Sequence, residues 1–182
     1  MKNYSTTRQL TLTALFTTIT VIGSFIRIPL LYSSFTLQFF CAAMAGILLG
    51  PNLGSLSQAL YLLLGLLGLP IFASGGGINY VFQPTFGFLL ASIPATWTIG
   101  HIAKQKRDRS QIIFACTIGL SVLYLIGLPY MAMILRFYLH EHLNFYQLLL
   151  VGVFPFLPGD AIKVVLCAIL CPRIETRVQR MH

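Results

Sequence analysis

The sequence has 182 residues, of which 57% are hydrophobic and only 9% are charged, whereas ordinary globular domains contain roughly 25% charged residues. Too few polar side chains remain to cover a water-facing surface, so the composition excludes an ordinary soluble domain and predicts a protein embedded in a lipid bilayer. The net charge of +8 does not indicate nucleic-acid binding, because the basic residues lie at both termini and in one short loop.

Six long apolar segments follow one another along the chain, with short connections between them. Since a helix needs about 20 largely apolar residues to cross a bilayer, these segments predict six transmembrane helices. They are expected at about residues 10–28, 37–49, 56–72, 84–102, 112–137 and 160–171. The Gly50-Pro51 turn should join the second and third into a helical hairpin. The predicted fold class is therefore an all-α integral membrane protein forming a single domain over residues 1–182.

A shorter apolar stretch at residues 145–157 precedes the last helix and is about half as long as the bilayer is thick. Counting it as a seventh span would place the basic C-terminal tail outside the cell. We therefore expect a short interfacial or re-entrant segment there.

The basic residues predict the orientation, because cytoplasmic segments of membrane proteins are enriched in Lys and Arg. With six spans and a cytoplasmic N-terminus, nine of the twelve basic residues fall inside: Lys2, Arg8, Lys104, Lys106, Arg107, Arg109, Arg173, Arg177 and Arg180. Both termini are thus expected in the cytoplasm, in a multi-pass protein of a cell membrane, bacterial in origin. Of the remaining three, Arg27 and Arg136 are expected to extend to lipid headgroups at the outer ends of their helices.

This topology places the irregular connections at residues 29–36, 73–83 and 139–159 on the extracellular face. Non-helical backbone at membrane depth persists only where protein or a water-filled cavity covers it, so a binding site is expected on that face. Candidate ligand contacts in the glycine-rich connection are Gly76, Asn79, Tyr80 and Gln83. A plain flexible turn would explain the glycines equally well.

Gln38 and Phe35 are further candidates, because they lie at the outer start of the second helix beside other aromatic residues. An aromatic wall for an apolar ligand is one interpretation of this cluster. Contact with lipid, or packing within the protein, is the other.

Asp160 and Lys163 form the strongest candidate pair. A charged residue deep in a transmembrane helix costs on the order of 2.5–3.5 kcal/mol on insertion scales, so it needs a partner or a cavity. At a spacing of three residues the two side chains share one helix face. Asp160 is expected to cap the helix N-terminus, since it follows Pro158-Gly159. Either the pair is a self-contained cap and ion pair, or it binds a ligand with polar N–H groups and an acceptor or carboxylate.

The remaining polar residues favour no other chemistry. His140 and His142 have no evident third ligand, so no metal or other cofactor is expected. The four cysteines lie in apolar segments and are interpreted as buried small side chains. Ala14 and Thr18 are small residues four apart, a spacing that lets a second helix approach closely, and packing within this chain would explain it equally well.

Several motifs resemble those of the BioY family, the biotin-specific S components of energy-coupling factor (ECF) transporters. They are Thr36-Leu37-Gln38, Leu48-Leu49-Gly50-Pro51-Asn52-Leu53-Gly54, the stretch from Tyr61 to Ala73, and Phe154-Pro155-Phe156-Leu157-Pro158-Gly159-Asp160-Ala161-Ile162-Lys163. The resemblance implies the six-helix S-component fold, with biotin held near the outer surface. It also implies that Asp160 and Lys163 are among the residues that bind biotin. It also implies partners: a transmembrane coupling subunit, which docks on Ala14 and Thr18, and two cytosolic ATPases.

The sequence departs from the family pattern in two places. Thr18 stands where the family has a second alanine, and Phe86 and Phe88 stand where it usually has Gly and Tyr. The second departure keeps open an S component for a different vitamin. A stand-alone carrier is a further alternative, although no inverted repeat is evident. An intramembrane enzyme is disfavoured, since no nucleophile motif or carboxylate pair is visible, and a pure scaffold would not need Asp160 and Lys163.

Overall fold

The computed structural model describes residues 6–29, 34–104, 108–141 and 144–180, and its described part is almost entirely helical. The helices are α1 (Thr6–Phe25), α2 (Gln38–Leu49), α3 (Pro51–Leu66), α4 (Phe86–Ala103), α5 (Arg109–Phe137), α6 (Phe145–Gly152) and α7 (Leu157–Arg180). Two short antiparallel strands, β1 (Arg27–Pro29) and β2 (Ser34–Thr36), follow α1, and a 3-10 helix, η1 (Ile78–Phe82), precedes α4. The predicted all-α architecture is confirmed.

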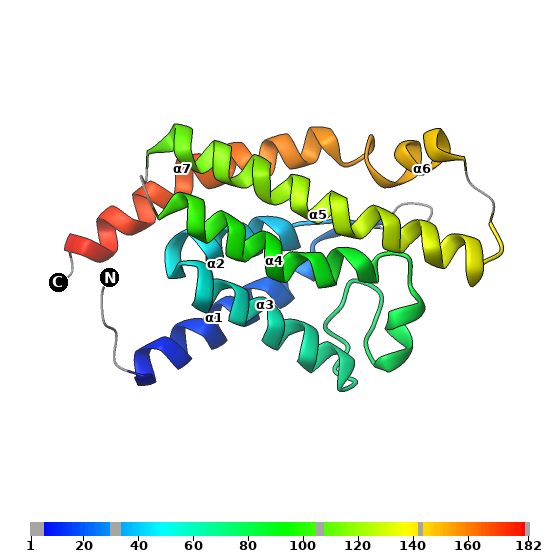
Figure 1. Cartoon of the computed structure of the whole chain (residues 1–182). Helices are drawn as coiled ribbons and strands as arrows, with labels where there is room; N and C mark the ends of the chain where they lie inside the picture. The colour runs from blue at the N-terminus through cyan, green and yellow to red at the C-terminus, as the bar shows by residue number, and fades with distance from the viewer. Residues whose placement is uncertain (1–5, 30–33, 105–107, 142–143, 181–182) are drawn as a thin grey trace.

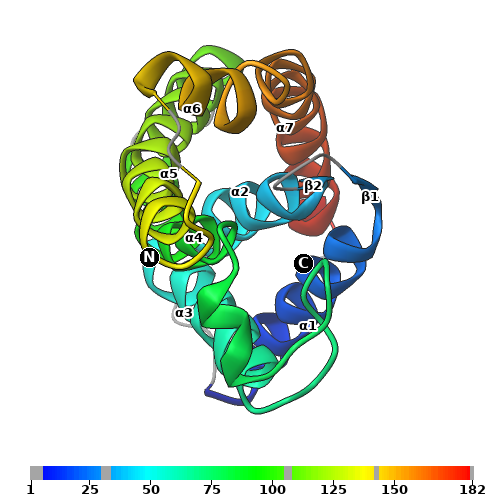
Figure 2. The ribbon, with the colours of Figure 1, turned by 90° about the vertical axis from the view of Figure 1, so that its right-hand side faces the viewer.

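The helices run roughly along one long axis, so that the molecule has two distinct ends (Figure 1). The start of α1, the end of α4 and the end of α7 lie at one end. The other end carries η1, α6 and the end of α5, and Figure 2 looks onto this end, where the strands β1 and β2 are also visible. The segments predicted to be cytoplasmic therefore gather at one end and the irregular connections at the other. Lys2, Lys106 and Arg107, which contributed to the charge count, lie outside the described residues.

Two of the described helices, α4 and α5, are long and apolar enough to cross a membrane. A third span results if α6 and the first part of α7 are taken together, since this pair passes the same test but bends by 46° at its break. Helix α2 is a shorter apolar helix of 12 residues.

Glycine residues bring α2, α3 and α4 into backbone contact. A Cβ atom on Gly100 of α4 would lie 2.6 Å from the Pro51 nitrogen and 2.7 Å from the Gly46 carbonyl oxygen. The turn between α2 and α3 is the single residue Gly50, whose φ of 87° favours glycine. Helix α3 starts at Pro51, five residues earlier than predicted, because proline is well tolerated in the first helical turn.

Helix α1 packs against α3 through hydroxyl and amide groups rather than through apolar side chains alone. Thr17 Oγ1 donates to the Ser57 carbonyl at 3.0 Å, and Gln58 Nε2 donates to Thr20 Oγ1 at 3.1 Å. These side chains are buried, whereas Ala14 and Thr18 are exposed on another face of α1. Internal packing thus uses the threonine face and leaves the small-residue pair uncovered.

Two further predicted boundaries are wrong. Helix α3 ends at Leu66 rather than near residue 72, because the chain turns back and buries Phe72 against Tyr61 and Tyr80. Helix α7 begins at Leu157, so that Asp160 lies within its first turn and its backbone N–H already donates to the Phe156 carbonyl at 2.8 Å. Asp160 is therefore not the N-cap, and its carboxylate is available for other partners.

Candidate ligand-binding site

A cavity of about 520 Å³ lies between α2, α4, α5 and α7 and is bordered by the strands and by the connection between α3 and α4. Its volume falls within the range of about 300–1,000 Å³ typical of small-molecule sites. Apolar walls are formed by Phe39, Phe88, Leu89, Leu123 and Phe156, among others. Polar groups come from Arg27, Thr36, Gln38, Ser74, Tyr80, Gln83, Tyr124, Asp160 and Lys163.

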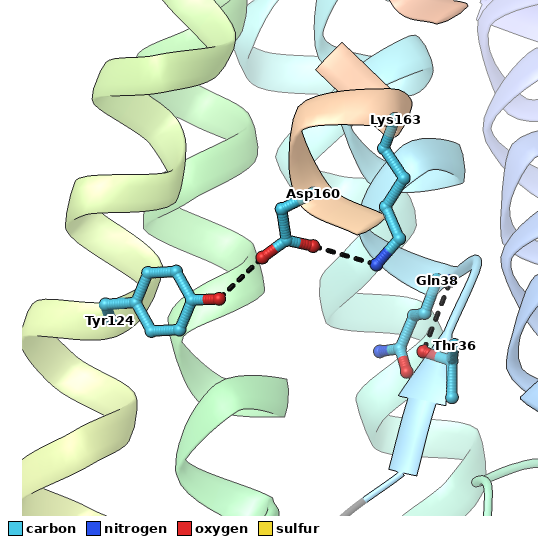
Figure 3. A network of polar contacts seen from close by, with 5 residues as sticks. All are labelled: Thr36, Gln38, Tyr124, Asp160 and Lys163. Atoms are coloured by element: carbon cyan, nitrogen blue, oxygen red, sulfur yellow. Dashed lines mark hydrogen bonds and ion pairs between the residues drawn. The ribbon is translucent and has the colours of Figure 1, made fainter. Parts of the chain in front are cut away.

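An ion pair of buried residues forms the polar centre of this cavity. Lys163 Nζ lies 2.9 Å from Asp160 Oδ1, and the two residues are only 4% and 5% exposed. The Tyr124 hydroxyl of α5 donates to the other carboxylate oxygen, Oδ2, at 2.5 Å. Figure 3 shows the carboxylate lying between the phenol and the ammonium. Asp160 is thus held from both sides, which fixes its orientation toward the cavity.

Phe35 covers the ammonium group of Lys163. The Nζ atom lies 4.0 Å from the centroid of the Phe35 ring, within the range of a cation–π contact. The ring also packs against Phe156, with centroids 6.4 Å apart. A Cβ on Gly159 would lie 2.1 Å from the ring, so glycine is needed there for Phe35 to keep this position.

Gln38 stands beside the ion pair with its side-chain amide uncommitted. Its backbone N–H donates to Thr36 Oγ1 at 3.4 Å, and Figure 3 shows its side chain near the end of Lys163. Among the described residues the Gln38 amide has no hydrogen-bond partner. Its two N–H donors and its carbonyl oxygen are therefore free for a ligand.

The structure brings five of the eight predicted binding residues to the cavity: Gln38, Tyr80, Gln83, Asp160 and Lys163. Phe35 contacts the cavity indirectly, through Lys163. Gly76 and Asn79 are exposed in the connection between α3 and α4 and do not border the cavity. Of the two phenylalanines that depart from the family pattern, Phe88 borders the cavity, whereas Phe86 is buried against Tyr130. His142, considered with His140 as a metal ligand, lies outside the described residues.

Sequence reasoning missed four of the polar residues listed above, namely Arg27, Thr36, Ser74 and Tyr124. Tyr124 lies in the middle of a long apolar helix, 36 residues before Asp160, and nothing in its local sequence marks it. Arg27 was interpreted as a headgroup contact, yet it borders the cavity and donates to Ser74 Oγ at 3.3 Å. The arginine lies at the outer end of the first predicted helix, next to the connection at residues 29–36 that was assigned to the outer face, and that placement was the available signal.

Comparisons with known proteins identify the family. The family model described as "BioY family" matches residues 1–180. A probable biotin transporter BioY of Lysinibacillus sphaericus is 36% identical over 176 residues, covering 96% of this chain and 90% of the relative. The biotin transporter BioY of Thermotoga maritima is 35% identical over 169 residues, covering 92% and 96%.

A solved structure shares the fold. The crystal structure of the S-component for biotin from an ECF-type ABC transporter superposes with a TM-score of 0.81 at 26% sequence identity, covering 97% of this chain and 95% of that one. The sequence motifs, the helical architecture and these matches agree, and the chain belongs to the BioY family.

Proposed function

We propose that this chain is the biotin-binding membrane subunit of an ECF-type ABC transporter and that it captures biotin at the extracellular face for ATP-driven uptake. The observation that carries the proposal is the buried Asp160–Lys163 pair, held by Tyr124 at the centre of a cavity of about 520 Å³. The similarity to biotin transporters and to a solved biotin S-component supports the choice of ligand.

The chemistry of the cavity suits the ureido ring of biotin. A carboxylate accepts N–H donors, so Asp160 is matched to the ureido N–H groups, while Lys163 and the Gln38 amide supply donors for the ureido oxygen. Because the two N–H groups of a cyclic urea point to opposite sides of its carbonyl, Asp160 accepts from one of them. The reverse orientation would place the ligand carboxylate beside Asp160, where like charges repel in a poorly solvated site. The apolar bicycle then lies against Phe88, Leu123 and Phe156.

The test is biotin titration into the detergent-purified protein by calorimetry. Wild type is expected to bind tightly, and Asp160→Asn and Lys163→Ala are each expected to weaken binding at least about 100-fold, since each leaves a buried charge without its partner. Lys104→Ala is the matched control, because Lys104 is exposed at the end of α4, away from the cavity. Folded wild-type protein that binds no biotin would overturn the proposal.

We further propose six membrane spans with cytoplasmic termini and transport driven by partner subunits: a transmembrane coupling protein and two cytosolic ATPases. The exposed pair Ala14 and Thr18 on α1 supports a docking surface for the coupling protein, since small residues allow close helix approach. Ala14→Trp and Thr18→Trp should keep biotin binding and lose ATP-dependent uptake. Uptake by vesicles containing this chain alone would instead support a stand-alone carrier.

A different vitamin is the second candidate. Phe88 borders the cavity at a position where the family usually has another residue, so the shape of the apolar wall differs locally. If biotin fails to bind and another vitamin binds with loss in Lys163→Ala, the ligand assignment changes while the site assignment stands.

A further inference from the structure

The charges that border the cavity do not balance. Among the described residues that border the cavity, Arg27 and Lys163 are the cations and Asp160 is the one carboxylate. The chain contains three other acidic residues: Asp108 and Glu175 belong to segments at the opposite end of the molecule, and Glu141, exposed just beyond α5, does not border the cavity. Asp160 is already engaged by Lys163 and Tyr124. The cavity therefore carries one positive charge in excess, which favours an anionic ligand.

Of the two cations that border the cavity, Arg27 is the one without an ionic partner among the described residues. Within the described part of the chain its guanidinium makes one hydrogen bond, to the uncharged Ser74 Oγ at 3.3 Å. Four of its five N–H donors therefore remain available. A guanidinium is the side chain best matched to a carboxylate, because two parallel N–H groups meet its two oxygens.

The strand pairing adds further donors next to Arg27. Arg27 of β1 pairs directly with Thr36 of β2 in the antiparallel register, and directly opposed residues project from the same face of a hairpin. Both residues border the cavity, as does Ser74 from the connection between α3 and α4. One guanidinium and two hydroxyl groups thus border the cavity at a second polar position, where Arg27 and Ser74 are exposed and Thr36 is half-buried, whereas the Asp160–Lys163 pair is buried.

We infer that Arg27, assisted by Ser74 and Thr36, binds the carboxylate of the ligand and makes the site selective for the free acid. The inference rests on the proposed function and adds to it the recognition of the ligand's second end. In biotin the carboxylate and the ureido ring lie at opposite ends of the molecule. The exposed position therefore binds the carboxylate, and the buried pair binds the ureido ring.

Calorimetry with two ligands tests this assignment: biotin, and biotinamide, in which a neutral carboxamide replaces the carboxylate. Wild type should prefer biotin by about 10-fold or more, as expected for loss of a charge-assisted hydrogen bond. Arg27→Gln should weaken biotin binding about 10- to 100-fold, leave biotinamide binding nearly unchanged, and so abolish the preference. Arg27→Lys should recover part of the preference, because it restores the charge without the fork geometry.

Arg136→Gln is the matched control. Arg136 is the other outer arginine and lies over the Phe137 ring, away from the cavity, so its removal should leave both affinities unchanged. Equal weakening of biotin and biotinamide by Arg27→Gln would show a structural role and overturn the inference. Unchanged affinities of Arg27→Gln for both ligands would also overturn the inference and would support the interpretation of Arg27 as a contact to lipid headgroups. Absence of biotin binding by folded wild type would overturn the proposed function, and with it this assignment.

Discussion

Burying the Asp160–Lys163 pair costs folding free energy, which indicates that the pair has a role in ligand binding. Both residues are nearly inaccessible, and removing two charges from water costs several kcal/mol per ion, which their mutual attraction only partly offsets. An apolar pair of similar volume would hold α7 in place at least as well. The local geometry also directs the pair inward, since Tyr124 and Phe35 each fix one partner. A preorganised carboxylate and ammonium reduce the entropy lost when a ligand binds.

Tyr124→Phe tests how far this preorganisation contributes. The change removes one hydroxyl, leaves the ring that packs against Phe88, and deprives Asp160 Oδ2 of its donor. Biotin affinity is expected to fall about 10-fold, the lower range for a hydrogen bond to a charged group, because Lys163 still orients the carboxylate. Titration calorimetry measures the change. Tyr146→Phe, at an exposed tyrosine of α6, should bind like wild type; an unchanged affinity in Tyr124→Phe would show that Lys163 alone orients Asp160.

Local spacing explains which site residues could be foreseen. Asp160 and Lys163 lie one helical turn apart, so their proximity follows from the helix alone. Tyr124 and Arg27 reach the cavity from elements 36 or more residues away in the sequence. Only the packing of α5 against α7 and the pairing of β1 with β2 beside the cavity bring them there. Asn79 and Gly76 were expected in the site because their connection faces it. Which residues of a loop point inward depends on its path, and the path here is set by the burial of Phe72 and Tyr80.

At the scale of elements, the contact of α2, α3 and α4 depends on glycine residues, which have no side chain to keep the backbones apart. Helices gain little from apolar burial within lipid, so close backbone approach and van der Waals packing hold them together. Gly46, Gly54 and Gly100 provide that approach, and at each of them an added Cβ would lie within 3.0 Å of backbone atoms that cannot rotate away. The helical hairpin foreseen at Gly50-Pro51 is therefore also the point at which α4 is anchored.

Gly100→Ala is expected to destabilise the protein. The added methyl would meet backbone atoms of Pro51 and Gly46, and overpacking of this kind costs about 1–3 kcal/mol, offset in part by the helix propensity of alanine. The melting temperature in detergent should fall by roughly 2–8 °C, since each kcal/mol corresponds to about 2–4 °C for a chain of this size. Gly119→Ala is the comparison, because there the nearest atoms belong to the Ile99 side chain, which can adjust. If Gly100→Ala is no less stable than Gly119→Ala, the backbone of the α2–α3 hairpin can move to accommodate the added methyl group, and the prediction is wrong.

Periodicity and turn signals placed most helices but missed two departures from regular structure. The apolar run continues past Leu66, yet the chain leaves the helix, since Gly68 takes a φ of 107° and the segment folds back so that Gly77 N–H donates to the Gly65 carbonyl at 2.7 Å. The strands β1 and β2 are three residues each, too short for alternation to be visible. Both departures are fixed by tertiary contacts, and both border the ligand cavity.

At the scale of the whole molecule, the asymmetry between the two ends agrees with the asymmetry of charge. The ends of α4 and α7, which carry Lys104 and Arg173, lie away from the cavity and the irregular connections (Figure 1). The number of spans was predicted from apolar length, but helix length establishes only two or three among the described helices. Helix α1 owes its lower apolar character to the hydroxyl groups that bind α3, a contribution that hydropathy does not anticipate.

Cysteine labelling tests the proposed orientation of the whole molecule. The four native cysteines are buried, so wild type should react little with a membrane-impermeant maleimide on intact cells. Asn79→Cys, exposed in η1, should be labelled on intact cells, since its end of the molecule is proposed to face outside. Ser110→Cys, exposed in the first turn of α5 at the opposite end, should be labelled only after the membrane is permeabilised. The reverse pattern would invert the topology and place the cavity on the cytoplasmic side, which is incompatible with uptake. Labelling of both variants on intact cells would place the two ends on the same side of the membrane and contradict the proposed spans.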